Sequence, residues 1–436
     1  METERPSYAD FTVPRRPSVF DAPLDLPEGV FAGADDGHRV PRQHDGEKRG
    51  GCQGVAYLTA AVLSFCPPGG SLGGIEAGTR LAGHNMTRMM LSSTQERVTT
   101  SAQALRSLED RFGLGGGYYG DTEGWTGLTS IWHLFQIGQA YHIAALSSEN
   151  SGDSEERLHV LLRAADAYWS AQPQEYLAGY DPDVVSMVTL RTEPERFVDD
   201  NLWMGLLLMD MYDKTGERTY YERAAQVMDM ATSQWDANKG GIYWKTQFPS
   251  EQNRDKALVS NMPAVALATR LYTASCKDVC APEYATWAEK IFAWADATLF
   301  DPQSGVYFDK LETDGAIDQT VYTYGQGMAI EALRGLHTID SGKYPVQLAV
   351  DVASRSMRAF RVMRNYGTAK FDAIYLRALM KLAGHLNDPR FTQDVVDAQN
   401  RILVALPFYP PNVVQSAAGV TVLALVELPV ERWKEL

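Results

Sequence analysis

The chain has 436 residues, of which 45% are hydrophobic and 22% are charged, and its formal net charge is −15 at pH 7. This composition is typical of a globular protein. The acidic balance argues against nucleic acid, anionic membranes and polyanionic substrates, because a nucleic-acid-binding protein is expected to carry a basic surface. Neutral polymers such as polysaccharides remain open.

The first 90 residues predict a disordered or leader segment. Residues 1–50 are rich in Pro, Asp, Arg and Gly and show no helical period. The basic pair Lys48 and Arg49 then precedes an apolar run at 52–66, which resembles a signal peptide but lies inside the chain and is too short to span a membrane. A buried helix is the alternative. We expect secretion if the true start precedes this run, and a cytoplasmic protein otherwise.

From about residue 95 the pattern is helical throughout, because apolar residues recur at intervals of three and four. Segments that are apolar on most faces alternate with amphipathic ones. The apolar segments are 128–147, 199–213, 258–273, 322–338, 371–385 and 413–427. The amphipathic segments are 95–112, 155–170, 217–235, 283–298, 343–362 and 389–405.

A helix that is apolar all round must be buried, whereas a helix with a polar stripe faces water. Six buried helices surrounded by six amphipathic ones predict an all-α fold, an (α/α)6 toroid of six helical hairpins, in a single domain over 91–436. An open solenoid is the alternative, but it would need capping repeats that the sequence lacks.

The connections from each amphipathic helix to the next apolar helix are long, as at 113–125, 236–256 and 301–327. They should cluster at the N-terminal ends of the inner helices, and long loops on a rigid scaffold often carry function. In one of the short connections, Cys276 and Cys280 either form a local disulfide or remain free thiols. A zinc site is not expected, because no second pair of ligands has a matching spacing.

The segment RFVDDNLW places Asp199 and Asp200 together at the start of the second inner helix. One acid there could simply cap the helix. Two adjacent carboxylates repel each other, which favours one anion and one neutral acid. A retaining glycosidase needs that division, with its carboxyl groups ~5–5.5 Å apart. The pair alone is a weak signal.

The run FVDDNLWMGLLLMDMYDKTGERTYYERAAQV resembles glycoside hydrolase family 76. The later blocks GGIYWK, KALVSNMPAVALATRLY, TYGQGMAIEAL and FDAIYLRALMKL agree with the family in order and spacing, so that the resemblance covers roughly residues 95–430. It implies an (α/α)6 toroid and endo-acting, retaining hydrolysis of α-1,6-mannan, although some fungal relatives are thought to transfer mannan-bearing glycans. It also implies that Asp199 is the nucleophile and Asp200 the general acid/base.

The resemblance extends to further residues of the site. The family's GGI(W/Y)W motif, whose aromatic residues lie at the cleft, ends here at Tyr243 and Trp244. Its K-x-x-x-(S/T)-N motif corresponds to Lys256 and Asn261. Its Tyr-Asn-Gln-Gly block is Tyr324-Gly325-Gln326-Gly327 here, so a glycine replaces the usual asparagine.

Other polar and aromatic residues could either contact the substrate or have a structural role. We expect substrate binding by the following residues: Trp132, Tyr243, Trp244, Lys256, Asn261, Tyr322, Tyr324 and Gln326. Trp125 has either role, and His133 is expected to be structural. Asp181 and Asp183 are expected to form a turn, and Asp309, Glu312 and Asp314 a solvated acidic loop. The methionines at 204, 209, 211, 228 and 230 are expected to fill the core.

The leading hypothesis is a monomeric α-1,6-mannanase without cofactor or metal, acting on α-mannan and without a nucleic-acid partner or a membrane span. The alternatives are a transglycosylase, a sugar epimerase or lyase, and a carbohydrate-binding protein without catalysis. Epimerases and lyases of this fold rely on His or Tyr bases, and the histidines here are scattered.

Overall fold

The computed structural model describes residues 100–124, 127–147, 152–170, 177–184, 196–247, 251–363, 368–408 and 412–436. Residues 1–90, which the sequence predicts to be disordered or a leader, lie outside this part of the chain, as does Trp125. The predicted domain limits therefore stay a prediction.

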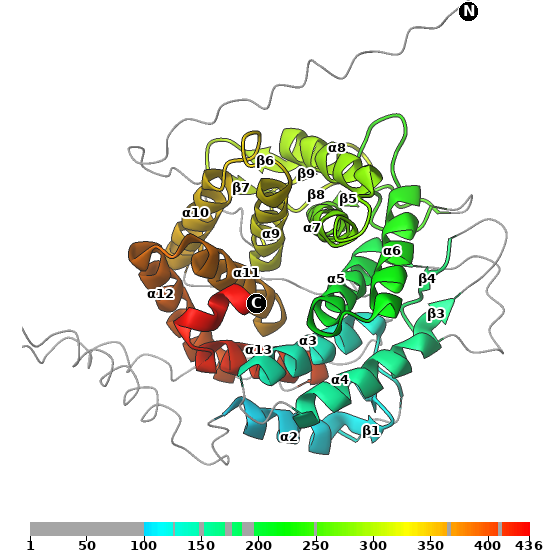
Figure 1. Ribbon diagram of the computed structural model, residues 1–436, viewed down its shortest axis with the longest axis vertical. Coiled ribbons are helices and arrows are strands. Elements are labelled where there is room, and N and C mark those ends of the chain that lie inside the picture. Colours follow the sequence, from blue (N-terminus) through cyan, green and yellow to red (C-terminus); the bar gives the residue numbers. More distant parts are fainter. Residues whose placement is uncertain are drawn as a thin grey trace, which may run out of the picture. The chain divides into compact units, whose positions relative to one another are not determined.

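The described residues form twelve α-helices, and these alternate between an inner and an outer ring (Figure 1). The inner helices are α3 (Ile131–Ser147), α5 (Val198–Thr215), α7 (Leu258–Ser275), α9 (Thr323–Ile339), α11 (Ala369–Leu386) and α13 (Val413–Glu427). The outer helices are α2 (Ser101–Phe112), α4 (Gly152–Ala165), α6 (Arg218–Ser233), α8 (Pro282–Leu299), α10 (Gln347–Met363) and α12 (Pro389–Ala405). Each of the twelve predicted segments corresponds to one of these helices.

The ring is closed. Each inner helix packs against the next one along the chain, and the last, α13, packs against the first, α3, as well as against α2. Figure 1 shows the six inner helices around a common centre with the outer helices outside them. The expected (α/α)6 toroid is therefore confirmed, and the open solenoid is excluded.

Burial follows the predicted alternation. In α7 most side chains are buried all around the helix, whereas in α6 the buried residues lie on one stripe that includes Ala224, Val227 and Ala231. An inner helix is covered on every side by its neighbours and its outer partner, so it needs apolar residues on all faces. The five methionines of α5 and α6 are buried, as predicted: Met204, Met209, Met211, Met228 and Met230.

Short antiparallel strands occur in the loops, where the sequence predicted none. They are β1 (Gly113–Gly115) with β2 (Tyr118–Tyr119), β3 (Trp169–Ser170) with β4 (Gly179–Tyr180), and β6 (Phe300–Asp301) with β7 (Val306–Tyr307). A fourth sheet joins β5 (Lys256–Ala257), β8 (Lys310–Leu311) and β9 (Ile317–Asp318). Two or three residues are too few for an alternating pattern to be recognised. Three short 3-10 helices complete the described part: η2 (Asp166–Tyr168), η3 (Leu406–Phe408) and η4 (Val430–Glu435).

The two ends of the ring differ in what they carry. We call the end formed by the first turns of the inner helices the loop end, and the end formed by their last turns the opposite end. The strands β4 and β5 lead into α5 and α7 at the loop end. The turn between α7 and α8 lies at the opposite end, and there Cys276 and Cys280 form a disulfide, one of the two alternatives left open by the sequence. No helix in the described part is both long and apolar enough to cross a membrane.

Candidate active site

Asp199 and Asp200 lie in the first turn of α5, at the loop end of the ring. Both residues are half-buried, but their carboxyl groups point into the protein. The Oδ1 atom of Asp199 is buried and has no hydrogen-bond partner in the described part of the chain. An unsatisfied buried oxygen in a native protein calls for an explanation, and an atom that awaits a substrate is one.

The two carboxyl groups differ in their surroundings. Burial raises the pKa of Asp199 to about 7, although hydrogen bonds from the Trp244 indole and from the backbone N–H groups of Asp200 and Asp199 itself oppose the rise. Burial and the negative charge of Asp199 raise the pKa of Asp200 well above its usual range. Only Asp199 has hydrogen bonds that stabilise its ionised form, so Asp199 ionises first and Asp200 retains its proton.

The GGIYW segment is attached directly to the start of α5. The backbone N–H of Val198 donates to the carbonyl of Trp244 (2.9 Å), and the N–H of Thr246 donates to the carbonyl of Arg196 (3.0 Å). The rings of Phe197 and Trp244 are in contact, with centroids 5.1 Å apart. This segment therefore forms a wall beside the carboxylate pair.

The glycines of this segment allow a close approach to α8. Gly241 has φ +82°, a conformation that L side chains rarely adopt, and a Cβ atom there would come within 2.5 Å of the Trp294 ring. The segment can lie flat on Trp294 only because residue 241 has no side chain. The family-like GG pair thus has a packing role.

Asp309 is a third carboxyl group near the pair, and the sequence analysis missed it. It follows β7, and its backbone carbonyl accepts a hydrogen bond from Leu258 at the start of α7 (2.6 Å). Burial and the charges of Asp318 and Asp199 together raise the pKa of Asp309 to about 7. The prediction that Asp309 belongs to a solvated loop is therefore wrong.

The remainder of that prediction concerned Glu312 and Asp314. The Asp314 carboxylate accepts from the backbone N–H of Ala316 (2.9 Å), which shapes the turn between β8 and β9. Among the described residues, no group of three or more His, Cys, Asp or Glu side chains is placed to hold a metal ion.

Aromatic side chains from four inner helices meet near the pair, and we call them the aromatic layer. Trp132 of α3 contacts Trp203 of α5 (centroids 5.6 Å apart), and Trp203 in turn faces Tyr324 of α9 (6.4 Å). Tyr324 stacks on Phe371 of α11 at 4.0 Å with an interplanar angle of 12°. Tyr322 packs edge-on against both Tyr324 and Phe371.

The hydroxyl group of Tyr324 is within range of the charges of all three carboxyl groups. Burial and the negative charges of Asp309, Asp199 and Asp200 raise its pKa well above the usual range. A neutral phenol is a hydrogen-bond donor. Of the predicted substrate-binding residues, Trp132, Tyr322 and Tyr324 are thus grouped with the pair, and their contact with a sugar stays a prediction.

Asn261 and Gln326, two predicted sugar contacts, are instead fully buried. The Asn261 amide accepts from the N–H of Ile242 (2.9 Å) and donates to its carbonyl (3.2 Å). The Gln326 amide makes the same two bonds to Tyr307 (3.0 and 2.8 Å). We therefore reassign both residues from sugar contact to support of the loops.

The same arrangement occurs a third time. The buried Asn201 accepts from the N–H of Tyr180 (2.7 Å) and donates to its carbonyl (2.9 Å). Asn201, Asn261 and Gln326 each occupy the fourth position of their inner helix. We call them the amide clamps, because each fastens one residue of the preceding loop to an inner helix.

Lys256, another predicted substrate-binding residue, also has structural partners. Its side chain is 3% exposed and its ammonium group donates to Asp236 (2.7 Å) and to the carbonyl of Gly240 (2.6 Å). Both bonds are internal to the loop, so Lys256 fastens the turn before GGIYW. Tyr243 is half-buried, and its hydroxyl group is hydrogen-bonded to Asp236.

The remaining candidates have structural partners or lie at the surface. Asp181 accepts from the buried Arg196 (2.8 Å), and Asp183 is exposed in the same turn. His133 is bonded through Nδ1 to Asp121 (2.8 Å), which agrees with the structural role predicted for it.

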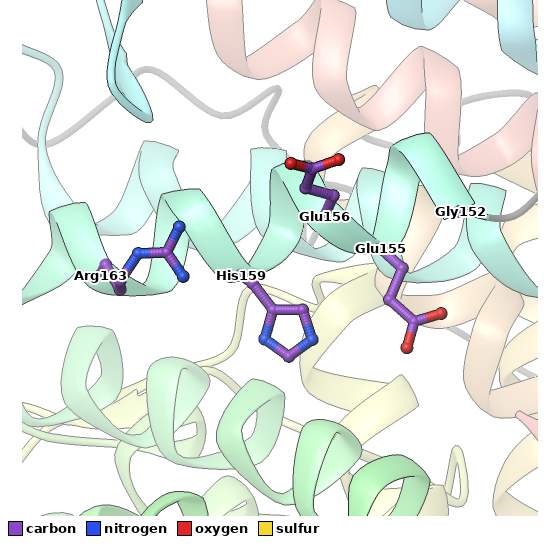
Figure 2. A pocket seen from close by; sticks show the side chains of 5 residues that line it. All are labelled: Gly152, Glu155, Glu156, His159 and Arg163. Atoms are coloured by element: carbon purple, nitrogen blue, oxygen red, sulfur yellow. The ribbon is translucent and has the colours of Figure 1, made fainter.

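A surface pocket on α4 lies away from this site. Gly152, Glu155, Glu156, His159 and Arg163 line it, all from one outer helix (Figure 2). Glu155 pairs with Lys214 (2.8 Å) in the last turn of α5, whereas Asp199 is in the first turn, ~22 Å away at 1.5 Å per residue. The pocket therefore has no part in the chemistry of the pair.

The described residues thus form a closed helical toroid with two adjacent carboxyl groups at the start of an inner helix. The sequence model of "Glycosyl hydrolase family 76" matches residues 165–359, which include the pair, the GGIYW segment and Asp309. The resemblance to family 76 is therefore confirmed over these residues. No curated protein sequence matches the chain.

Solved structures share the fold at low identity. The α-mannanase of glycoside hydrolase family 76 from Bacteroides thetaiotaomicron has a TM-score of 0.64 at 17% identity, over 74% of this chain and 93% of that one. An inactive variant of the α-1,6-mannanase of Salegentibacter sp. HEL1_6, in complex with α-1,6-mannotriose, has a TM-score of 0.57 at 19% identity, over 75% and 98%. Cellobiose 2-epimerase from Spirochaeta thermophila has a TM-score of 0.56 at 11% identity, and the match covers 83% of this chain and 98% of that one. Since an epimerase shares the fold, fold alone does not decide the reaction.

Proposed function

We propose that the protein is a retaining glycoside hydrolase that cleaves α-1,6-mannosidic bonds in mannan, with Asp199 as nucleophile and Asp200 as general acid/base. The observation that carries the proposal is the unequal pair at the start of α5. Asp199 accepts hydrogen bonds that favour its anion, whereas burial and the charge of Asp199 keep the proton on Asp200. A retaining mechanism needs one group of each kind.

In the first step the Asp199 carboxylate attacks the anomeric carbon while Asp200 donates its proton to the departing sugar oxygen, which leaves a glycosyl ester on Asp199. In the second step Asp200, now ionised, takes a proton from a water molecule that attacks the same carbon, and Asp199 is released. The two inversions together retain the α configuration. The raised pKa of Asp200 supplies the proton at neutral pH.

Two further observations support the choice of substrate. The family match spans the region that holds the pair. In the Salegentibacter α-1,6-mannanase, the inactive variant carries substitutions of two consecutive aspartates and was solved with an α-1,6-linked mannotriose. Asp199 and Asp200 are likewise consecutive, and the aromatic layer beside them offers flat apolar surfaces for sugar rings.

The test is digestion of unbranched α-1,6-mannan by the wild type and by Asp199→Ala and Asp200→Ala, with products followed by mass spectrometry and anomeric NMR. We expect the wild type to release short manno-oligosaccharides that are first formed in the α configuration, and both variants to lose this activity. Asp229→Ala, on the exposed side of α6, is the matched control and should keep full activity. First release of β-configured ends would contradict retention, and undigested mannan with the wild type would contradict the substrate.

A further inference from the structure

Trp244 is fixed on both sides of its backbone. Its carbonyl accepts from the N–H of Val198 (2.9 Å), the residue that precedes Asp199, and its own N–H donates to the carbonyl of Asp255 (2.8 Å). The neighbouring bridge between Phe197 and Lys245 continues this pairing. The position of the Trp244 side chain is thus tied to the first turn of α5.

The segment is also fixed upstream and downstream. Two residues before Trp244, the amide clamp Asn261 holds both backbone groups of Ile242. Beyond it, the Asp255 carboxylate accepts from the N–H and the hydroxyl of Thr313 (2.8 and 2.7 Å) and from Lys310 (3.0 Å). These contacts leave the Trp244 backbone little freedom to move away from α5.

The Trp244 ring packs on Phe197 beside the first turn of α5, and the Trp244 indole is the side-chain donor that opposes the rise in the pKa of Asp199. An indole N–H is a donor only. Its partner must therefore be an acceptor, and an ionised carboxylate is a stronger acceptor than a neutral acid. The Oδ1 atom of Asp199 is left without a partner among the described residues.

We propose that Trp244 is a positioning residue that orients Asp199 and favours its ionised form, leaving Oδ1 free to react, instead of serving chiefly as a surface on which a sugar ring stacks. For its effect on hydrolysis this inference rests on the proposed function. The contact itself does not depend on any substrate, so the two can be tested separately.

The substrate-free test is pH titration of the tryptophan indole N–H signals by 1H–15N NMR. The Trp244 signal is assigned by its loss in Trp244→Phe, which keeps an aromatic ring but has no N–H. We expect this signal to titrate in the wild type with the pKa of Asp199, and to stop titrating in Asp199→Asn. Tyr243→Phe, one residue away and bonded to Asp236, should leave the titration unchanged.

A Trp244 signal that is insensitive to Asp199→Asn would overturn the proposal, whatever the enzyme acts on. If Trp244→Phe fails to fold, Trp244→His serves for assignment, since imidazole also keeps a ring but moves the N–H. Failure of the proposed function looks different: the titration would be seen while mannan stays intact.

With an active enzyme, the pH profile gives a second readout. Removal of the indole bond raises the pKa of Asp199, so the acidic limb of kcat/KM in Trp244→Phe should move to higher pH. At pH 5 the loss relative to wild type should be about tenfold, and it should shrink as the pH rises toward about 9, where Asp199 is largely ionised in both proteins. A raised KM with an unmoved acidic limb would show sugar stacking and contradict the proposal.

Discussion

Two aspartates of the same helix, α5, have opposite surroundings. Asp200 in the first turn has a pKa raised well above its usual range by burial and by the charge of Asp199. Asp210, near the other end of α5, is also buried, yet Arg377 and Arg270 hold its pKa well below the usual range. The cations are close, with Arg270 at 2.8 Å and Arg377 at 2.9 Å from its oxygens.

The pKa values of Asp200 and Asp210 differ because of neighbouring cations and not because of burial. In the middle of α9, a second buried carboxylate, Glu331, pairs with Arg334 (3.0 Å), which helps to lower its pKa to about 2 despite burial. At the loop end, no ion pair among the described residues involves Asp199 or Asp200. Lys256 and Lys310 of this end are engaged by other acids, Lys256 by Asp236 and Lys310 by Asp255.

An acid that is paired with arginine stabilises the ring, whereas an acid left without a cation can exchange protons near neutral pH. By this contrast, the acids at the loop end are suited to catalysis, and Asp210 near the opposite end is suited to stabilising the ring. The same substitution, Asp to Asn, should therefore have different consequences at the two ends of α5.

The largest effect is expected on catalysis. Asp200→Asn removes the proton donor and should lower kcat on α-1,6-mannan by about 10²–10⁴-fold. Asp210→Asn, assayed well below its unfolding temperature, should lose less than tenfold, because Asp210 is at the far end of α5. A loss of similar size in both variants would show that the two ends do not divide these roles.

The next effect is on stability. Asp210→Asn breaks a buried group of charges and leaves Arg270 and Arg377 less compensated, so we expect a loss of about 3–5 kcal/mol in the free energy of unfolding. Denaturation by urea at pH 7, followed by circular dichroism, measures it. Asp229→Asn on the exposed side of α6 is the control and should change stability by less than about 0.5 kcal/mol. A loss below about 1 kcal/mol for Asp210→Asn would contradict the structural role.

The amide clamps should give a smaller loss. Asn261→Ala leaves the buried N–H and carbonyl of Ile242 without partners, which costs about 1–3 kcal/mol. Asn400→Ala, at an exposed position of α12, is the matched control and should be nearly neutral. If Asn261 contacted sugar instead, Asn261→Ala would weaken substrate binding at unchanged stability, which thermal unfolding without ligand would reveal.

Much of the fold could be predicted because its signals are local. The apolar period of 258–273 predicted α7, which begins at Leu258 and ends at Ser275. Local motifs also placed Asp199 and Asp200 at the start of α5. The roles of polar residues were harder, since a buried Asn that binds backbone and a cleft Asn that binds sugar look alike in a sequence. The shared fourth position of the amide clamps was a signal that could have been used.

Asp309 could not be found in this way. Its surroundings depend on how the loop between β7 and β8 returns to the start of α7, a contact between residues far apart in the sequence. In the sequence, Asp309, Glu312 and Asp314 resemble any solvated acidic loop. Only the fold shows that Asp309 lies beside Asp199 and Tyr324, whereas Asp314 forms a turn.

The smallest effect concerns the pH dependence of stability, and its sign should reverse between the two ends of α5. The folded-state pKa of Asp200 is raised, so its ionisation opposes folding, and stability falls as pH rises from the unfolded value of about 3.9 through the folded value. Asp200→Asn removes this penalty. We expect it to be more stable than the wild type by on the order of 1 kcal/mol at pH 8.

For Asp210 the folded-state pKa is lowered, so its stabilisation is present above about 3.9 and is lost as pH falls through the folded value. The deficit of Asp210→Asn should therefore be constant between pH 6 and 8 and shrink below about pH 4. The gain of Asp200→Asn should shrink toward pH 4, because Asp200 is then neutral in the folded state and only about half ionised in the unfolded state. Thermal unfolding of the wild type and both variants between pH 2 and 8 measures the two curves. A gain in stability for Asp200→Asn that persists undiminished at pH 4 would have a cause other than the charge of Asp200. Only Asp210 would then support the contrast between the two ends.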